Sequence, residues 1–155
     1  VYTLEEFGFS GYFSYGDQVQ YGSSPFLGNG STGSIRASLR PFSRLQSELS
    51  VRTSNLIDPF ADTEVFDVKI YRAQSTYQFS DRLLLRNIME YNTFSRKLGA
   101  NVLFTYRVNS GTVFYVGYDD HYQQGGHIDA YRFPTPDLRR TNRAIFTKLQ
   151  YLFRY

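Results

Sequence analysis

Residues 143–155 read Arg143-Ala-Ile-Phe-Thr-Lys-Leu-Gln-Tyr-Leu-Phe-Arg-Tyr155 and show the clearest strand pattern of the chain. From Ile145 onward every second residue is apolar, aromatic or threonine, and the residues between them include Lys148, Gln150 and Arg154. Successive side chains of a β-strand point to opposite faces of its sheet. The pattern therefore predicts a strand with one apolar and one polar face.

The same period of two recurs in seven further stretches, whereas a helical period is almost absent. These stretches are residues 6–15, 34–40, 44–54, 65–79, 82–93, 101–108 and 112–121. In residues 65–79 the apolar residues near the start, Phe66, Val68 and Ile70, are out of phase with those that follow. This indicates a bulge or a part that stands clear of a membrane. Eight strands of this kind predict an all-β, antiparallel domain.

The connections between the predicted strands alternate between short and long. Tight turns are predicted at 41–43, 80–81 and 109–111, and longer connections at 16–33, 55–64 and 123–142, with residues 95–99 as a short exception. No linker divides the chain, so residues 1–155 are predicted to form a single domain. The chain starts at Val1 without a signal peptide, which indicates a mature product or a piece of something longer.

Composition excludes several classes of protein. The chain has no Cys, which excludes disulfide scaffolds and cysteine zinc sites. Its net charge of +3 is spread along the chain and gives no clustered basic patch, so nucleic acid is not expected as a partner. No stretch approaches the roughly 18 apolar residues of a membrane helix, so any membrane role requires a barrel.

The polar face of the predicted sheet carries charges of both signs, which suits a confined lumen. The residues expected to face this lumen are Arg36, Glu48, Arg52, Arg72, Arg86, Glu90, Arg107 and Lys148. The opposite face is continuous, apolar and aromatic at both ends, as bilayer interfaces require. We therefore expect a transmembrane β-barrel with periplasmic tight turns and extracellular long loops, and outer-membrane lipid as its surroundings. A soluble barrel with an apolar interior is the alternative.

The end of the chain resembles the C-terminal signal by which the outer-membrane assembly machinery recognises its clients. The residues that carry this resemblance are Leu149, Tyr151, Phe153 and Tyr155. It implies the assembly machinery as a partner and the outer membrane of a Gram-negative bacterium as the location.

Several short stretches carry a further resemblance. They are Tyr15-Gly-Asp-Gln, Pro25-Phe-Leu-Gly, Ser38-Leu-Arg-Pro, Thr76-Tyr-Gln-Phe-Ser-Asp-Arg-Leu, Thr112-Val-Phe-Tyr-Val-Gly-Tyr and Phe146-Thr-Lys-Leu-Gln-Tyr-Leu-Phe-Arg-Tyr. Together they resemble the C-terminal outer-membrane barrel, of uncharacterised function, of Gram-negative surface proteins that carry an N-terminal carbohydrate-binding module similar to family nine. The resemblance implies that these are the last strands of a larger protein, and it carries over no binding residue.

Two architectures remain open at this point. Eight strands can close alone into a narrow barrel that side chains fill. Alternatively, the eight strands are an arc of a wider barrel whose polar face borders water. The family resemblance favours the arc.

Candidate chemistry is sparse, and we predict no catalytic, cofactor or metal site. Asp119, Asp120, His121, His127 and Asp129 offer ligand types for a metal, but their spacing matches no fixed motif, and solvated acidic loops are the preferred interpretation.

Two further groups of residues have a preferred structural interpretation. Glu48 and Glu90 resemble the acid pair of a glycosidase, yet lumen arginines surround them, so ion pairing is preferred. The loop aromatics are Tyr21, Phe26, Tyr122 and Tyr131, which could stack on sugars but are expected to pack the loops together.

The expected function is that of a membrane anchor and surface platform, used in glycan binding or uptake or in contacts with other surface proteins. A passive pore or transporter subunit is the first alternative, and a soluble ligand-binding barrel is the second. An enzyme is the least favoured class.

Overall fold

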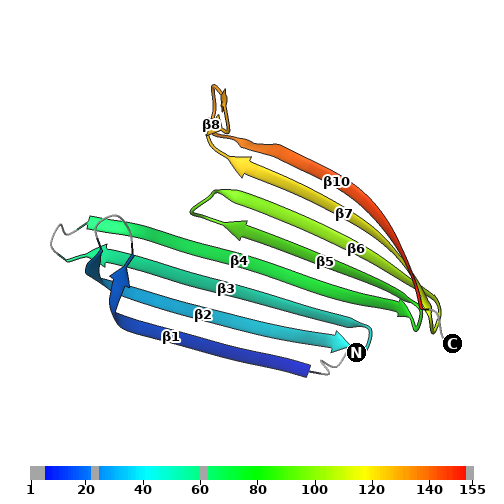
Figure 1. The fold of residues 1–155 in the computed structure, drawn as a ribbon. Helices are drawn as coiled ribbons and strands as arrows, with labels where there is room; N and C mark the ends of the chain where they lie inside the picture. Colours follow the sequence, from blue (N-terminus) through cyan, green and yellow to red (C-terminus); the bar gives the residue numbers. More distant parts are fainter. Residues whose placement is uncertain (1–5, 22–24, 60–62, 153–155) are drawn as a thin grey trace.

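The computed structural model describes residues 6–21, 25–59 and 63–152. Within them, eight strands form one antiparallel sheet, which confirms the all-β prediction (Figure 1). Its strands are β1 (Glu6–Gln20), β2 (Phe26–Phe42), β3 (Leu45–Asp58), β4 (Thr63–Ser80), β5 (Leu83–Asn92), β6 (Lys97–Asn109), β7 (Thr112–Gln124) and β10 (Leu138–Tyr151). A small separate hairpin joins β8 (His127–Ile128) to β9 (Tyr131–Arg132). A search of the described residues for helices that could cross a membrane finds none.

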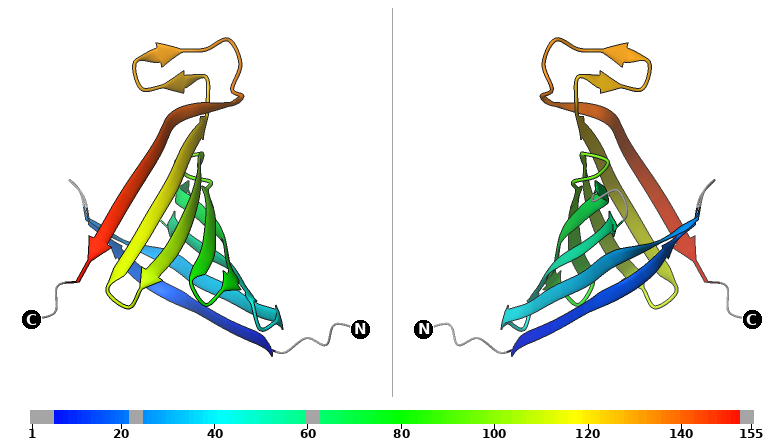
Figure 2. Two further views of the ribbon diagram at one scale, coloured as in Figure 1. Left: turned by 90° about the vertical axis from the view of Figure 1, so that its right-hand side faces the viewer. Right: turned by 90° about the vertical axis from the view of Figure 1, so that its left-hand side faces the viewer.

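The sheet is open. Its strand order follows the chain from β1 to β7 and ends with β10, and among the described residues β1 and β10 each pair on one side only. Figure 2 shows the sheet curled into an arc with these two strands at its ends. The eight strands therefore do not close on themselves, and each edge presents a row of backbone groups that could pair with a further strand.

The strand register brings the predicted faces together. Residues directly opposite each other on neighbouring strands share a face. One such row lies on the apolar face and contains, in successive strands, Phe9, Ala37, Leu49, Ala73 and Met89. The adjacent row lies on the polar face and contains Ser10, Arg36, Ser50, Arg72 and Glu90. The alternation predicted from the sequence thus holds across the sheet.

The apolar face is exposed rather than packed into a core. Leu49 is 52% exposed and Leu149 is 67% exposed. Among the described residues the only buried large hydrophobic side chains are Leu56 and Ile128, and Ile128 belongs to the small hairpin. The apolar side chains therefore do not meet in a dry centre, which is what a soluble barrel with an apolar interior requires.

Several strands are longer than predicted at the end that carries the longer connections. The predicted loop 16–33 is largely sheet, because β1 and β2 stay paired from Gly16 opposite Gly30 to Gln20 opposite Phe26. Glycine and serine conceal the alternation here, although the ladder needs only backbone groups. A Cβ atom at Gly30 would lie 2.5 Å from the end of the Gln18 side chain, so a larger residue here would force that side chain to move.

The other long connections are also shorter than predicted. β3 extends to Asp58 and β4 begins at Thr63, and β10 begins at Leu138. The tight turns lie at 43–44, 81–82 and 110–111, all at the opposite end of the sheet. The predicted alternation of short and long connections is therefore confirmed.

The bulge predicted in the fourth strand lies beyond the residues that suggested it. β3 and β4 pair in unbroken register from Ile70 opposite Arg52 to Phe66 opposite Leu56, and the shift falls at Val65. Phe66 and Ile70 therefore stay on the same face as Arg52. The change of phase therefore means that the polar face becomes apolar near the longer connections, where Phe66 and Ile70 lie.

Candidate functional site

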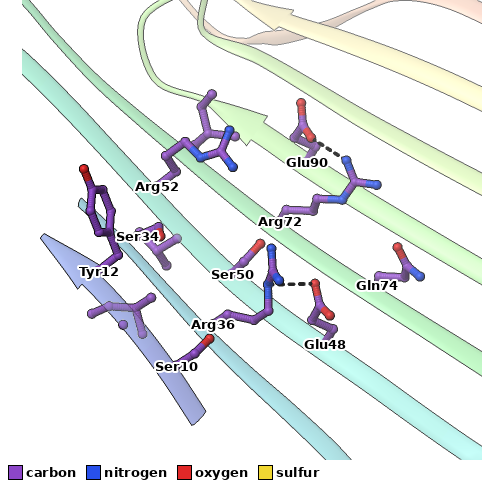
Figure 3. A pocket seen from close by; sticks show the side chains of 14 residues that line it. Ser10, Tyr12, Ser34, Arg36, Glu48, Ser50, Arg52, Arg72, Gln74 and Glu90 are labelled. Carbon is purple, nitrogen blue, oxygen red and sulfur yellow. Dashed lines mark hydrogen bonds and ion pairs between the residues drawn. The ribbon is translucent and has the colours of Figure 1, made fainter. Parts of the chain in front are cut away.

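The polar face contains a pocket, and we call it the polar pocket. It has a volume of about 580 Å³ and lies over β1 to β5 (Figure 3). The charged side chains that line it are Arg36, Glu48, Arg52, Arg72 and Glu90. Side chains from five neighbouring strands line this hollow, which indicates that the polar face is the concave face of the arc; a smaller hollow on the apolar face lies only over β1 to β3. Five of the eight predicted lumen residues thus gather at one place.

Two ion pairs cross the polar pocket. The Nε atom of Arg36 lies 3.3 Å from Oε1 of Glu48, and Nη1 of Arg72 lies 3.2 Å from Oε2 of Glu90. Each pair joins neighbouring strands, and all four side chains are roughly half exposed. The predicted ion pairing of both glutamates is therefore confirmed.

Arg52 gives the polar pocket its excess charge. No carboxylate pairs with Arg52 among the described residues, and its guanidinium points into the pocket (Figure 3). Three arginines against two glutamates leave one net positive charge. The pocket is therefore suited to water and small polar or anionic groups, and not to an apolar ligand.

The remaining three predicted lumen residues share the concave face but lie outside the polar pocket. Arg86 is opposite Thr76, Arg107 is opposite Val113, and Lys148 is opposite Tyr115. The Nζ atom of Lys148 lies 5.9 Å from the centre of the Tyr115 ring. The concave face thus carries charges from the polar pocket to the tight turns. These three residues lie on separate strands and do not form a second cluster.

The exposed ion pairs of the two glutamates predict a small effect of their substitution on stability. Each carboxylate is held by its own arginine, so Glu48→Gln and Glu90→Gln should each change the free energy of unfolding by less than about 1 kcal/mol, the usual size for exposed pairs. Urea titration checks this. A panel of chromogenic glycosides should show no hydrolysis, and hydrolysis that either substitution abolishes would establish an enzyme.

The candidate metal residues do not converge. Asp119 and His121 lie on the concave face, where Nδ1 of His121 is 3.5 Å from Oδ2 of Asp119. Asp120 points to the opposite face because it is the residue between them in β7. His127 and Asp129 belong to the β8–β9 hairpin. Within residues 6–21, 25–59 and 63–152, no three His, Asp or Glu side chains are placed to hold a metal ion.

Asp120 contradicts the interpretation of this region as solvated acidic loops. It lies within a strand, and its side chain is only 5% exposed. Its Oδ2 atom accepts hydrogen bonds from the hydroxyls of Tyr118 (2.7 Å) and Tyr122 (2.9 Å) and from Nη2 of Arg143 (3.2 Å). The Nε atom of Arg140 lies 3.4 Å from Oδ1. We call these five residues the Asp120 cluster.

The Asp120 cluster could not be predicted from the sequence, because it depends on a bulge in β10. The Tyr-x-Asp-x-Tyr spacing of β7 was visible, but Arg140 and Arg143 are three residues apart and would point to opposite faces of a regular strand. The register between β7 and β10 shifts at Thr141, so both arginines reach Asp120. Nothing in the sequence marks that bulge.

The structure does not gather the loop aromatics into a sugar platform. Phe26 packs beside Gly28 on the concave face, whereas Tyr122 lies on the apolar face with Asp120. Tyr131 is exposed on the small hairpin, and Tyr21 is exposed after β1. These side chains occupy different faces and elements, and they form no common surface.

Only half of the predicted assembly signal lies in the described part of the chain. Leu149 and Tyr151 are exposed on the apolar face of β10, opposite Phe114 and Thr112. Phe153 and Tyr155 lie outside the described residues. The resemblances to the assembly signal and to the surface-protein barrel stay predictions. No protein-family model, curated protein or solved structure significantly matches this chain.

Proposed function

We propose that this sheet belongs to an outer-membrane β-barrel of a Gram-negative bacterium, which serves as a membrane anchor and surface platform. The observation that carries the proposal is the exposed apolar face, which all eight strands share. Soluble monomers rarely expose apolar patches larger than a few hundred Å². Lipid hydrocarbon removes this face from water, and the antiparallel ladder already satisfies the backbone groups between the strands.

The height of the apolar face supports the same proposal. On β4 it runs from Phe79, whose ring packs edge-on against Tyr77, to Tyr71. Beyond Tyr71 the same face carries Lys69 and Asp67, whose charged groups lie 2.8 Å apart. Residues 71–79 match the roughly 9 to 11 residues that a tilted strand needs to cross the hydrocarbon. The rest of β4 would stand clear of it, as the sequence suggested.

The open edges favour an arc of a wider barrel. In hydrocarbon an unpaired sheet edge costs several kcal/mol for each exposed backbone group, so β1 and β10 need partner strands there. Further strands of a longer chain, which the family resemblance implies, would supply them. The concave face would then border water, which accords with its half-exposed arginines and glutamates.

A passive pore or transporter subunit is the second candidate, because the charged polar pocket is suited to contact with water. Recording from planar bilayers that contain the purified full chain distinguishes the two. A silent bilayer is expected for an anchor and platform, and step-like ion currents would favour the pore. If the protein stays in solution without detergent, both proposals fail. A role in glycan binding or uptake rests on the family resemblance alone.

A further inference from the structure

The Asp120 cluster is an exception on the face that we place in lipid. Asp120 shares its row with Ala100, Met89 and Ala73, yet it is a carboxylate with four polar neighbours. The row above it on the apolar face contains Tyr122, Leu98 and Tyr91, which places the cluster near the border toward the longer connections. Tyrosine is enriched at the level of lipid headgroups.

The cluster is built around a buried carboxylate. The side chain of Asp120 is almost completely buried under the four groups that contact it. The bulge at Thr141 turns both arginines toward it, and the Thr141 hydroxyl donates to the His121 carbonyl at 3.2 Å. A hydrogen bond to Asp120 holds Arg143 and an ion pair with Asp120 holds Arg140, and such contacts lower the entropy lost when the arginines bind a ligand.

The cluster has unused capacity to bind an anion. Two arginines against one carboxylate leave a net positive charge, and each guanidinium uses one nitrogen on Asp120. The side chains of Arg140 and Arg143 remain 47% and 46% exposed, above the rings of Tyr122 and Tyr118. The remaining N–H groups form the fork that binds phosphate oxygens.

We propose that the Asp120 cluster binds the phosphate group of a membrane lipid headgroup. This inference rests on the proposed membrane placement, since that placement puts exposed arginines beside headgroups. A basic residue on the lipid face costs little near the interface and attracts anionic lipid. The buried Asp120 holds the two guanidiniums side by side, so a single phosphate can contact both.

Native mass spectrometry of the detergent-purified full chain tests the inference, with phosphatidic acid and phosphatidylcholine as probes. We expect the wild type to bind phosphatidic acid about tenfold more tightly than phosphatidylcholine, because two basic residues attract an anionic surface. Arg140→Gln/Arg143→Gln should reduce this preference to about twofold. The charge-matched control is Arg132→Gln/Arg139→Gln. Arg132 lies in β9, and Arg139 lies near the start of β10 and donates a hydrogen bond to Thr135, so this variant should leave the preference unchanged.

The single variants Arg140→Gln and Arg143→Gln keep one ion pair on Asp120, so they serve if the double variant fails to fold. Each removes the net positive charge and should lose most of the preference. An unchanged preference in these variants, or equally tight binding of phosphatidic acid and phosphatidylcholine by the wild type, would overturn the inference. A chain that never enters detergent or vesicles contradicts the membrane placement instead, so the two failures are distinguishable.

Discussion

Phe104→Arg is expected to block assembly of the sheet into membranes, whereas Thr105→Arg should assemble almost normally. Phe104 lies on the apolar face between Leu85 and Val116, inside the ends of β5, β6 and β7. An arginine on the lipid side near mid-bilayer costs about 2 to 4 kcal/mol. Thr105 points to the concave face, where an added guanidinium reaches water.

The two variants differ by one position in the same strand, so each controls for the other. Both change an uncharged residue to arginine within β6. The measurement is the yield of folded, protease-resistant protein in phospholipid vesicles, made on the full protein so that β1 and β10 have the partner strands that an arc requires. We expect a loss of at least tenfold for Phe104→Arg, since about 1.4 kcal/mol corresponds to a factor of ten. Equal yields for the two variants would show that the assignment of the faces in β6 is wrong.

Leu56→Ala is expected to lower the free energy of unfolding by about 2 to 5 kcal/mol, the usual cost of a deleted buried leucine side chain. Leu56 is 2% exposed, the most buried large side chain among the described residues. It lies opposite Gly30 and Phe66, and a Cβ atom added at Gly28 would lie 3.0 Å from its Cδ1 atom. Alanine would leave a cavity against these neighbours.

Ile57→Ala is the matched control for this prediction. Ile57 is the next residue of β3, it points to the other face and it is 39% exposed. Its truncation should cost less than about 1.5 kcal/mol. Urea unfolding of the protein in detergent gives both values. A smaller loss for Leu56→Ala than for Ile57→Ala would show that no packed layer lies under the longer connections.

The faces of the strands could be predicted from the sequence because the period of a strand is two, whatever its neighbours are. Ile145 and Leu149 define the apolar face of β10 by their spacing alone, and the register then places them opposite Tyr118 and Phe114. The same argument placed Arg72 and Glu90 on one face, where they pair. The faces predicted from this period agree with the structure, whereas the bulge inferred from the change of phase at Phe66, Val68 and Ile70 lies elsewhere.

Predictions that depended on the ends of strands failed where small residues or bulges interrupt the pattern. Gly28 and Gly30 lie in a predicted loop but belong to β2. The loop predicted at 55–64 contains Leu56, the most buried large side chain among the described residues. The Asp120 cluster depends on the shift at Thr141, which is a property of how two strands pair and not of either strand.

The surroundings of each face of the sheet, lipid or water, can be measured with a spin label. The chain has no cysteine, so a single introduced Cys can be labelled with a nitroxide at Leu49→Cys or at Ser50→Cys, which lie on opposite faces of β3. With the protein in vesicles, molecular oxygen reports contact with lipid, and a water-soluble nickel complex reports contact with water. We expect the label at position 49 to collide mainly with oxygen and the label at position 50 mainly with nickel. The reverse pattern would show that water contacts the apolar face and would contradict the account.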